Sequence, residues 1–122
     1  MATMIKFRAW DKVTSNYRKV LGIKFYPDGT IENVEVGGFQ RKETITPGRL
    51  ILEQFTGLKD ANGNDIYVGD ILWAKNARWI VTNDYQMKLI GKNIKFSQMI
   101  LPPFVEIIGN VHENPELLEE DK

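Results

Sequence analysis

The chain has 122 residues, with 16 Lys and Arg against 16 Asp and Glu, one His and no Cys, and 43% of its residues are hydrophobic. This length suits one domain with a buried core, so we predict a single domain over residues 1–122. The lack of Cys excludes disulfides, a thiol nucleophile and thiolate metal sites. The balanced charge excludes a strongly basic chain held to nucleic acid by bulk electrostatics.

The sequence also bears on where the protein acts. No apolar run approaches the ~18 residues of a membrane-spanning helix, and residues 1–10 are too polar for a signal peptide. We therefore expect a soluble protein of the cytoplasm, with no membrane partner.

The zero net charge hides a gradient along the chain. Residues 1–50 contain nine Lys or Arg against five Asp or Glu, whereas residues 101–122 contain one against six. We interpret the acidic end, at about residues 113–122, as a solvated C-terminal helix and tail. The alternative is a contact between this tail and the basic N-terminal half, within one subunit or between two.

The first half of the chain has the pattern of strands separated by turns. Residues 4–10 alternate, with Phe7 facing inward and Trp10 facing outward beside Arg8. Strands at residues 20–26 and 31–36 flank residues 27–30, whose Pro-Asp-Gly-Thr sequence is typical of a hairpin turn. Residues 39–47 are polar enough to form a loop.

The second half continues this pattern. A strand begins at residue 50 and ends near residue 55, and a turn-rich stretch covers residues 56–65. A tight turn is predicted at residues 69–70. Further strands are predicted at residues 66–67, 71–74, 78–82, 87–90, 94–96 and 104–108. Short strands at this spacing indicate a mainly β fold, either a small barrel or a sandwich.

The last predicted element is a short C-terminal helix. Asn114 can cap it, Pro115 fits its first position, and the acidic residues that follow suit the positive end of a helix.

The sequence contains no catalytic constellation. The lone His112 cannot build a zinc site, and neither Ser15 nor Ser97 lies in a Gly-x-Ser-x-Gly motif. The known phosphate-binding loop motifs are absent. We therefore predict a protein that is not an enzyme and needs no cofactor or metal.

Residues 60–71 imitate a calcium-binding loop. Asp60 and Asn62 occupy its first and third positions, but Asp65 stands where the loop needs Gly, and Ile71 where it needs a bidentate Glu. We interpret this stretch as Asx turns with an Asn-Gly reversal. A metal-dependent hydrolase or nuclease that uses Asp60, Asp65 or Asp70 is the third-ranked alternative.

The N-terminal arm, residues 1–24, carries the strongest binding signal. It contains six basic residues against Asp11 alone, with Phe7, Trp10 and Tyr17 between them. Cations for phosphates and aromatics for bases are what a single-stranded nucleic-acid platform needs. The alternative is an edge strand protected by lysines, with its aromatics in the core. The basic residues are Lys6, Arg8, Lys12, Arg18, Lys19 and Lys24.

Three separated blocks of the sequence are similar to one known family. They read IKFRAWD from residue 5, QFTGLKDANG from residue 54 followed by IYVGDI, and VEIIGNVHENPELL from residue 105. In this order and spacing they resemble the YopX family of small phage and prophage proteins. The resemblance implies a mainly β fold built on a partly open barrel. It implies no reaction, because the family has no assigned catalytic residues.

Most matched positions suit turns and caps, where Gly accepts unusual backbone angles and Asp or Asn bonds backbone amides. The predicted turn and cap residues are Gly57, Asp60, Asn62, Gly63, Gly69, Asp70, Gly109, Asn110, Asn114 and Pro115. Five matched residues are less easily explained by architecture and form the candidate interaction surface. They are Arg8, Trp10, Lys59, Tyr67 and Glu113.

Together these observations predict a small, partly open β-barrel of antiparallel strands and hairpins with a short C-terminal helix. We expect it to be a phage or prophage protein that binds a second copy of itself or a host or phage protein, in the cytoplasm of the bacterial host. The alternative function is a nucleic-acid-binding accessory protein that uses the basic, aromatic N-terminal arm.

Overall fold

The structure is a computed structural model that describes residues 6–37, 41–91, 95–96 and 105–119, the side chains of residues 95–96 excepted. The chain divides into two compact units, Met1–Gln54 and Phe55–Lys122. Each unit has its own cluster of buried hydrophobic residues. The single domain over residues 1–122 stays a prediction.

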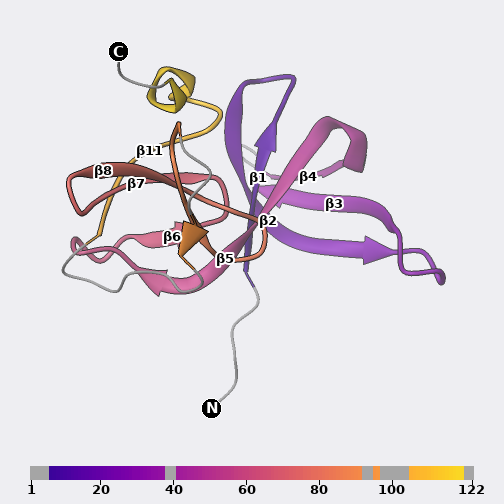
Figure 1. Ribbon diagram of the computed structural model, residues 1–122. Helices are drawn as coiled ribbons and strands as arrows, with labels where there is room; N and C mark the ends of the chain where they lie inside the picture. Colours follow the sequence, from indigo (N-terminus) through magenta and orange to yellow (C-terminus); the bar gives the residue numbers. More distant parts are fainter. Residues whose placement is uncertain (1–5, 38–40, 92–94, 97–104, 120–122) are drawn as a thin grey trace. The chain divides into compact units, whose positions relative to one another are not determined.

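The first unit is built on an antiparallel sheet (Figure 1). Its strands are β1 (Phe7–Asp11), β2 (Asn16–Phe25), β3 (Ile31–Gly37), β4 (Lys42–Ile45) and the first part of β5 (Leu50–Lys59). Their order is β4-β3-β2-β1-β5, and the 3-10 helix η1 (Pro47–Arg49) leads into β5. The predicted hairpin between β2 and β3 is confirmed: the backbone N–H of Tyr26 donates to the carbonyl of Thr30 at 2.8 Å.

One element of this unit differs from the sequence prediction. The expected loop at residues 39–47 is wrong over Lys42–Ile45, which forms β4 and pairs with β3. Residues 42–44 are exposed, so their polarity suits an edge strand whose backbone is satisfied by its neighbour. Residues 38–40 and 4–5 lie outside the described residues, so the start of the first predicted strand is not described.

Alternation along the strands builds the core of the first unit. Ala9 on β1 and Val34 and Val36 on β3 are fully buried, with Ile45 and Leu50 beside them. The face that carries Ala9 is therefore the inner one, as predicted, although Phe7 and Trp10 are both only half-buried.

The inner face of β1 ends on a buried carboxylate, Asp11. Its Oδ1 accepts from Nε of Arg49 at 2.8 Å and from the backbone N–H of Val13 at 2.9 Å. Its Oδ2 accepts from the guanidinium groups of Arg49 at 2.7 Å and Arg18 at 3.0 Å. This network joins β1, β2 and η1, and it satisfies a charge that would be costly to bury alone.

The second unit contains a five-stranded antiparallel sheet of order β10-β9-β8-β7-β11. Its strands are β7 (Asp70–Ala74), β8 (Ala77–Val81), β9 (Met87–Leu89), β10 (Lys95–Phe96) and β11 (Glu106–Asn110). The short β6 (Asp65–Tyr67) pairs with the second half of β5. Ile66, Leu72, Val81 and Met87 are among the residues at the centre of its core. Residues 94 and 104, the first of two predicted strands, lie outside the described residues.

The turn predicted at residues 56–65 begins too early. β5 continues to Lys59, and its pairing with β6 changes register between Phe55 and Lys59. Gly57 has a φ of 87° within this irregular stretch, so a glycine that suggested a turn instead accommodates a distortion inside a strand.

The side chain of Asp60 accepts the hydrogen bonds that close the turn after β5, and it also bonds the last strand, β11. Its Oδ1 accepts from the backbone N–H groups of Asn62 at 3.0 Å and Asn64 at 2.9 Å. Its Oδ2 accepts from the backbone N–H of Ile107 on β11 at 3.0 Å. Burial opposes ionisation of Asp60, but the bonds from Ile107, Asn64 and Asn62 outweigh it and lower its pKa.

One predicted feature at the level of the fold is corrected by the structure, and a second stays a prediction. The C-terminal helix is wrong: Pro115–Leu118 is a single 3-10 turn, η2, and the Asn114 side chain makes no cap hydrogen bond there. A four-residue segment forms too few helical bonds to offset the cost of nucleation. Each sheet has two edge strands in the described ranges, so no closed barrel is formed, and the partly open barrel stays a prediction.

In the part of the chain that the structure describes, no helix is long and apolar enough to span a bilayer.

We predict that Asp11→Asn lowers the free energy of unfolding by about 2–3 kcal/mol near neutral pH. The hydrogen bond from Arg49 holds the pKa of Asp11 far below its usual range, and burial opposes this only in part. The ionised carboxylate therefore stabilises the fold above the unfolded-state pKa of about 3.9, and this stabilisation is lost as the pH falls through the acid range.

The measurement is urea unfolding of both proteins across this pH range. The difference between them should shrink by about 1 kcal/mol on going to about pH 3. Glu119→Gln, which neutralises an exposed carboxylate, is the control and should change stability little. A difference for Asp11→Asn that does not depend on pH would contradict this account.

We also predict that Asp60→Asn destabilises the chain by about 1–2 kcal/mol, because an amide N–H₂ would then face one of the backbone donors. Thermal unfolding measures the effect, with Asp65→Asn as the control because Asp65 makes an exposed hydrogen bond to Lys59. Equal stability of the two variants would show that the Asp60 bonds contribute nothing.

Candidate interaction surface

Two of the predicted surface residues, Arg8 and Trp10, lie on the same face of β1, and both contact Tyr17. Nε of Arg8 donates to Oε1 of Glu53 at 2.9 Å, and its guanidinium carbon lies 4.3 Å from the centre of the Tyr17 ring. The hydroxyl of Tyr17 donates to the same Glu53 oxygen at 2.8 Å, and Trp10 packs edge-on against Tyr17 at 5.1 Å. The guanidinium group of Arg8 is therefore paired with the Glu53 carboxylate and lies over the Tyr17 ring.

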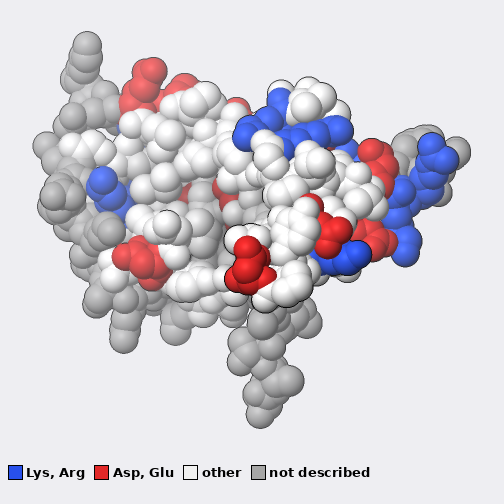
Figure 2. Space-filling model, turned by 90° about the vertical axis from the view of Figure 1, so that its right-hand side faces the viewer, with Lys and Arg blue, Asp and Glu red and all other residues white. Residues whose placement is uncertain are grey.

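Other basic residues of the first unit are paired as well. Arg18 bridges Asp11 and Glu43, with the second contact at 2.8 Å. Lys24 lies 3.8 Å from Glu32, and Lys42 lies 2.8 Å from Glu35. The face of the molecule in Figure 2 shows basic groups beside acidic ones, with wide uncharged areas between them.

The pairing of the two arginines of the arm weakens the charge pattern on which the nucleic-acid hypothesis rests. A strand-binding platform needs positive charge that can replace the counterions of phosphate groups. Here Arg8 and Arg18 already have carboxylate partners.

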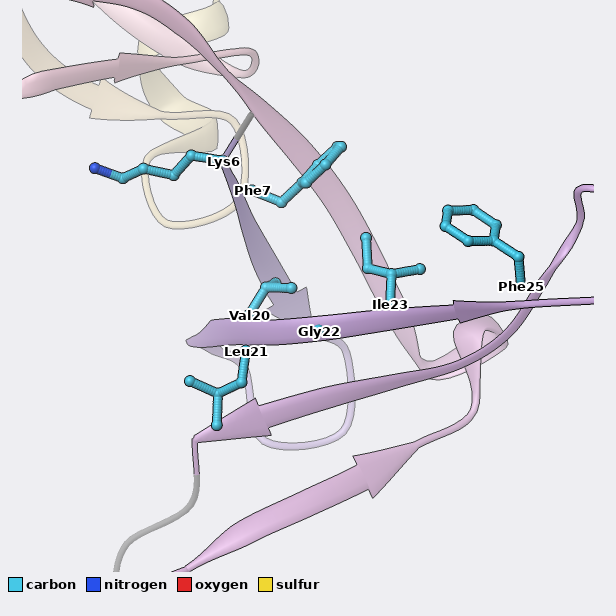
Figure 3. Close-up of a pocket in the computed structure, with 7 residues that line it drawn as sticks. All are labelled: Lys6, Phe7, Val20, Leu21, Gly22, Ile23 and Phe25. Carbon is cyan, nitrogen blue, oxygen red and sulfur yellow. The ribbon is translucent and has the colours of Figure 1, made fainter. Parts of the chain in front are cut away.

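An apolar groove of about 520 Å³ lies along β2. It is lined by Lys6, Phe7, Val20, Leu21, Gly22, Ile23 and Phe25. Phe7, Ile23 and Phe25 point to the same side of β2, whereas Leu21 points to the other side (Figure 3). Leu21 is 45% exposed and Phe25 is 55% exposed, as is the neighbouring Tyr26 at 51%.

A bulge in β2 places apolar side chains that are three residues apart on the same face of the strand. The pairing of β2 with β3 shifts register between Val20 and Gly22, so Val20 lies opposite Val36 and Ile23 lies opposite Val34. Val20 and Ile23 therefore both face the core, although they are three residues apart. Phe25 follows Ile23 at the open end of this apolar row.

The other three predicted surface residues lie in the second unit and have separate contacts. Nζ of Lys59 donates to Asp65 at 3.0 Å, and the ring of Tyr67 packs against Phe55 at 5.7 Å. Glu113 accepts from Nδ2 of Asn110 at 3.0 Å. The structure therefore assigns each of them a local structural contact.

The predicted turn residues are placed as follows. Gly63 lies in the turn after β5, and Gly69, with a φ of 93°, lies in the turn that enters β7. Oδ2 of the buried Asp70 accepts from the backbone N–H of Tyr67 at 2.8 Å. This bond closes the Gly69 turn, where positive φ favours glycine.

A second turn follows β11. Oδ1 of Asn110 accepts from the backbone N–H groups of His112 at 3.1 Å and Glu113 at 2.9 Å. Oδ1 of Asn114 accepts from the backbone N–H of Asn110 at 3.2 Å. A Cβ at Gly109 would lie 2.6 Å from the Asn114 amide oxygen, so the turn closes only because glycine leaves that space.

The structure also bears on the metal-site alternative. Within the described ranges, no group of three or more His, Asp or Glu side chains is placed to hold a metal ion. Both Asp60 oxygens accept backbone N–H groups. The prediction that the protein is not an enzyme stays a prediction.

Sequence reasoning missed Leu21 and Phe25 as surface residues. The available signal was the composition of residues 20–26, in which five of the seven residues are Val, Leu, Ile, Phe or Tyr. A strand that is apolar at consecutive positions has apolar groups on both faces.

The comparisons with known proteins concern nearly the whole chain. The sequence model of the YopX family, described as YopX protein, matches residues 6–119. The chain is also similar to the crystal structure of protein EF1440 from Enterococcus faecalis, with 27% identity and a TM-score of 0.67. That match covers 97% of this chain and 100% of the other. No curated protein matches the chain. The match over residues 6–119 shows that the chain belongs to the YopX family.

Proposed function

We propose that the chain is a non-enzymatic phage or prophage protein that acts in the bacterial cytoplasm by binding a segment of another phage or host protein. The observation that carries the proposal is the apolar groove along β2, with Phe25 more than half exposed at its end. Contiguous exposed apolar surface of this kind marks interaction sites on proteins that are otherwise polar outside. The partly open barrel belongs to the same proposal.

The charge around the groove favours a partner other than a second copy. Lys6 lines the groove, and Lys19 and Lys24 are exposed on β2. Two copies that met through this surface would bring the same lysines together, and like charges are unfavourable at an interface. An acidic partner is favoured instead.

Phe25→Ser should abolish most of the capture of the partner from a lysate of the encoding organism, because it removes an exposed aromatic anchor. Trp73→Ser is the matched control, since Trp73 is an exposed aromatic on strand β7 of the other unit. Quantitative affinity capture compares the two variants at equal protein stability. Equal capture by Phe25→Ser and the native chain would refute the groove as the binding site.

The nucleic-acid alternative has its own test. Fluorescence anisotropy with labelled single- and double-stranded oligonucleotides should show no saturable binding between about 50 mM and 200 mM salt, because the arginines of the arm are paired. Binding that weakens steeply over this range and is lost in the double variant of Lys6 and Arg8 to Ala would replace the proposed function.

A further inference from the structure

The open part of β2 lies directly beside the groove. β1 pairs with residues 16–19 of β2, and its pairing ends at Arg8 opposite Lys19. The rest of β2 pairs with β3 on its other side. Among the described residues, residues 21–25 therefore have no strand beside them on the β1 side.

A strand edge that has no neighbour on the β1 side among the described residues, beside an apolar groove, fits one kind of ligand. An extended peptide can add to an open sheet edge through its main chain and place alternate side chains in pockets beside that edge. Phe7 and Phe25 both line the groove, with Ile23 between them in the view of Figure 3.

The electrostatic surroundings define the ends of the ligand. Lys6 lines the groove, exposed Lys19 lies before the open stretch of β2, and exposed Lys24 lies near its far end. The Lys24 ion pair with Glu32 spans 3.8 Å between exposed side chains, so it holds this lysine only weakly. Carboxylates on the ligand would meet the ammonium groups of Lys19 and Lys24.

We infer that β2 binds an extended segment of a partner protein as an added strand beside residues 21–25, with apolar side chains at alternate positions and acidic residues at its ends. This inference rests on the proposed function and adds the mode of binding and the chemistry of the partner segment. The added strand continues the row of β1 and covers Phe25.

The first part of the test selects a ligand with the full chain. A displayed library of random ten-residue peptides is selected on the native protein. The enriched peptides should alternate apolar residues and carry Asp or Glu near their ends. They should bind Phe25→Ser at least about tenfold more weakly and Trp73→Ser normally. Failure to enrich any peptide that depends on Phe25 overturns the inference.

The second part separates strand addition from simple apolar docking. The best peptide is synthesised with backbone N-methyl groups on its odd residues or on its even residues. In an added strand only one of these sets faces β2, so one set should weaken binding by about tenfold or more and the other should leave it unchanged. Equal effects of the two sets overturn strand addition. The proposed function survives that result if binding still depends on Phe25, and it fails as well if it does not.

Two further measurements test the choice of occupant. A dimer in sedimentation that Phe25→Ser dissociates would make the occupant a second copy and overturn the choice of partner. Tighter peptide binding by Ile5→Asp would make the occupant the N-terminal segment of the chain itself, with the same consequence. A monomer, with peptide affinity unchanged by Ile5→Asp, supports the inference.

Discussion

The binding surface of the first unit depends on the difference in length between β1 and β2. β2 has ten residues and β1 has five, and the pairing between them ends at Lys19. Beyond that point β2 has a neighbour on one side among the described residues. Because this stretch is also bulged and rich in apolar side chains, an open edge and an apolar groove coincide. A β edge of this composition invites association unless it is covered or charged.

Several charged side chains of the same unit form ion pairs that stabilise its structure. The carboxylate of Asp11 receives two guanidinium groups and the backbone of the turn that follows, which fixes the end of β1 against β2 and η1. Glu53 does the same for Arg8 and Tyr17 on the outer face. The two arginines of the basic N-terminal arm are thus held in ion pairs, and Lys6 lines an apolar groove. This arrangement suits a protein segment better than a phosphate backbone.

Much of the fold could be predicted from local patterns. The Pro-Asp-Gly-Thr hairpin, the Gly69-Asp70 turn and most strands follow from turn chemistry and alternation, which act within a few residues. The errors came from pairing over longer distances. β4 is polar and forms because its backbone pairs with β3. β5 continues past Gly57 because its second half pairs with β6. The acidic C-terminal segment had the residues of a helix start but too few residues to propagate one.

The candidate site could be predicted less well than the fold. Arg8 and Trp10 were expected to be exposed, but both are half-buried by contacts with Glu53 and Tyr17. These partners lie on other strands, and the sequence carries no signal for those contacts. Phe25 looked like one more strand residue. Its exposure depends on where β1 stops beside β2, which is a property of the register and not of either strand alone.

The most direct test of the account is amide hydrogen exchange at residues 21–25 of β2, in the free chain and with the selected peptide bound. The account predicts fast exchange in the free chain for the amides of this stretch that do not bond β3, and strong protection of those amides in the complex. Unchanged exchange in the complex would contradict strand addition, and protection already complete in the free chain would show that this edge is not open.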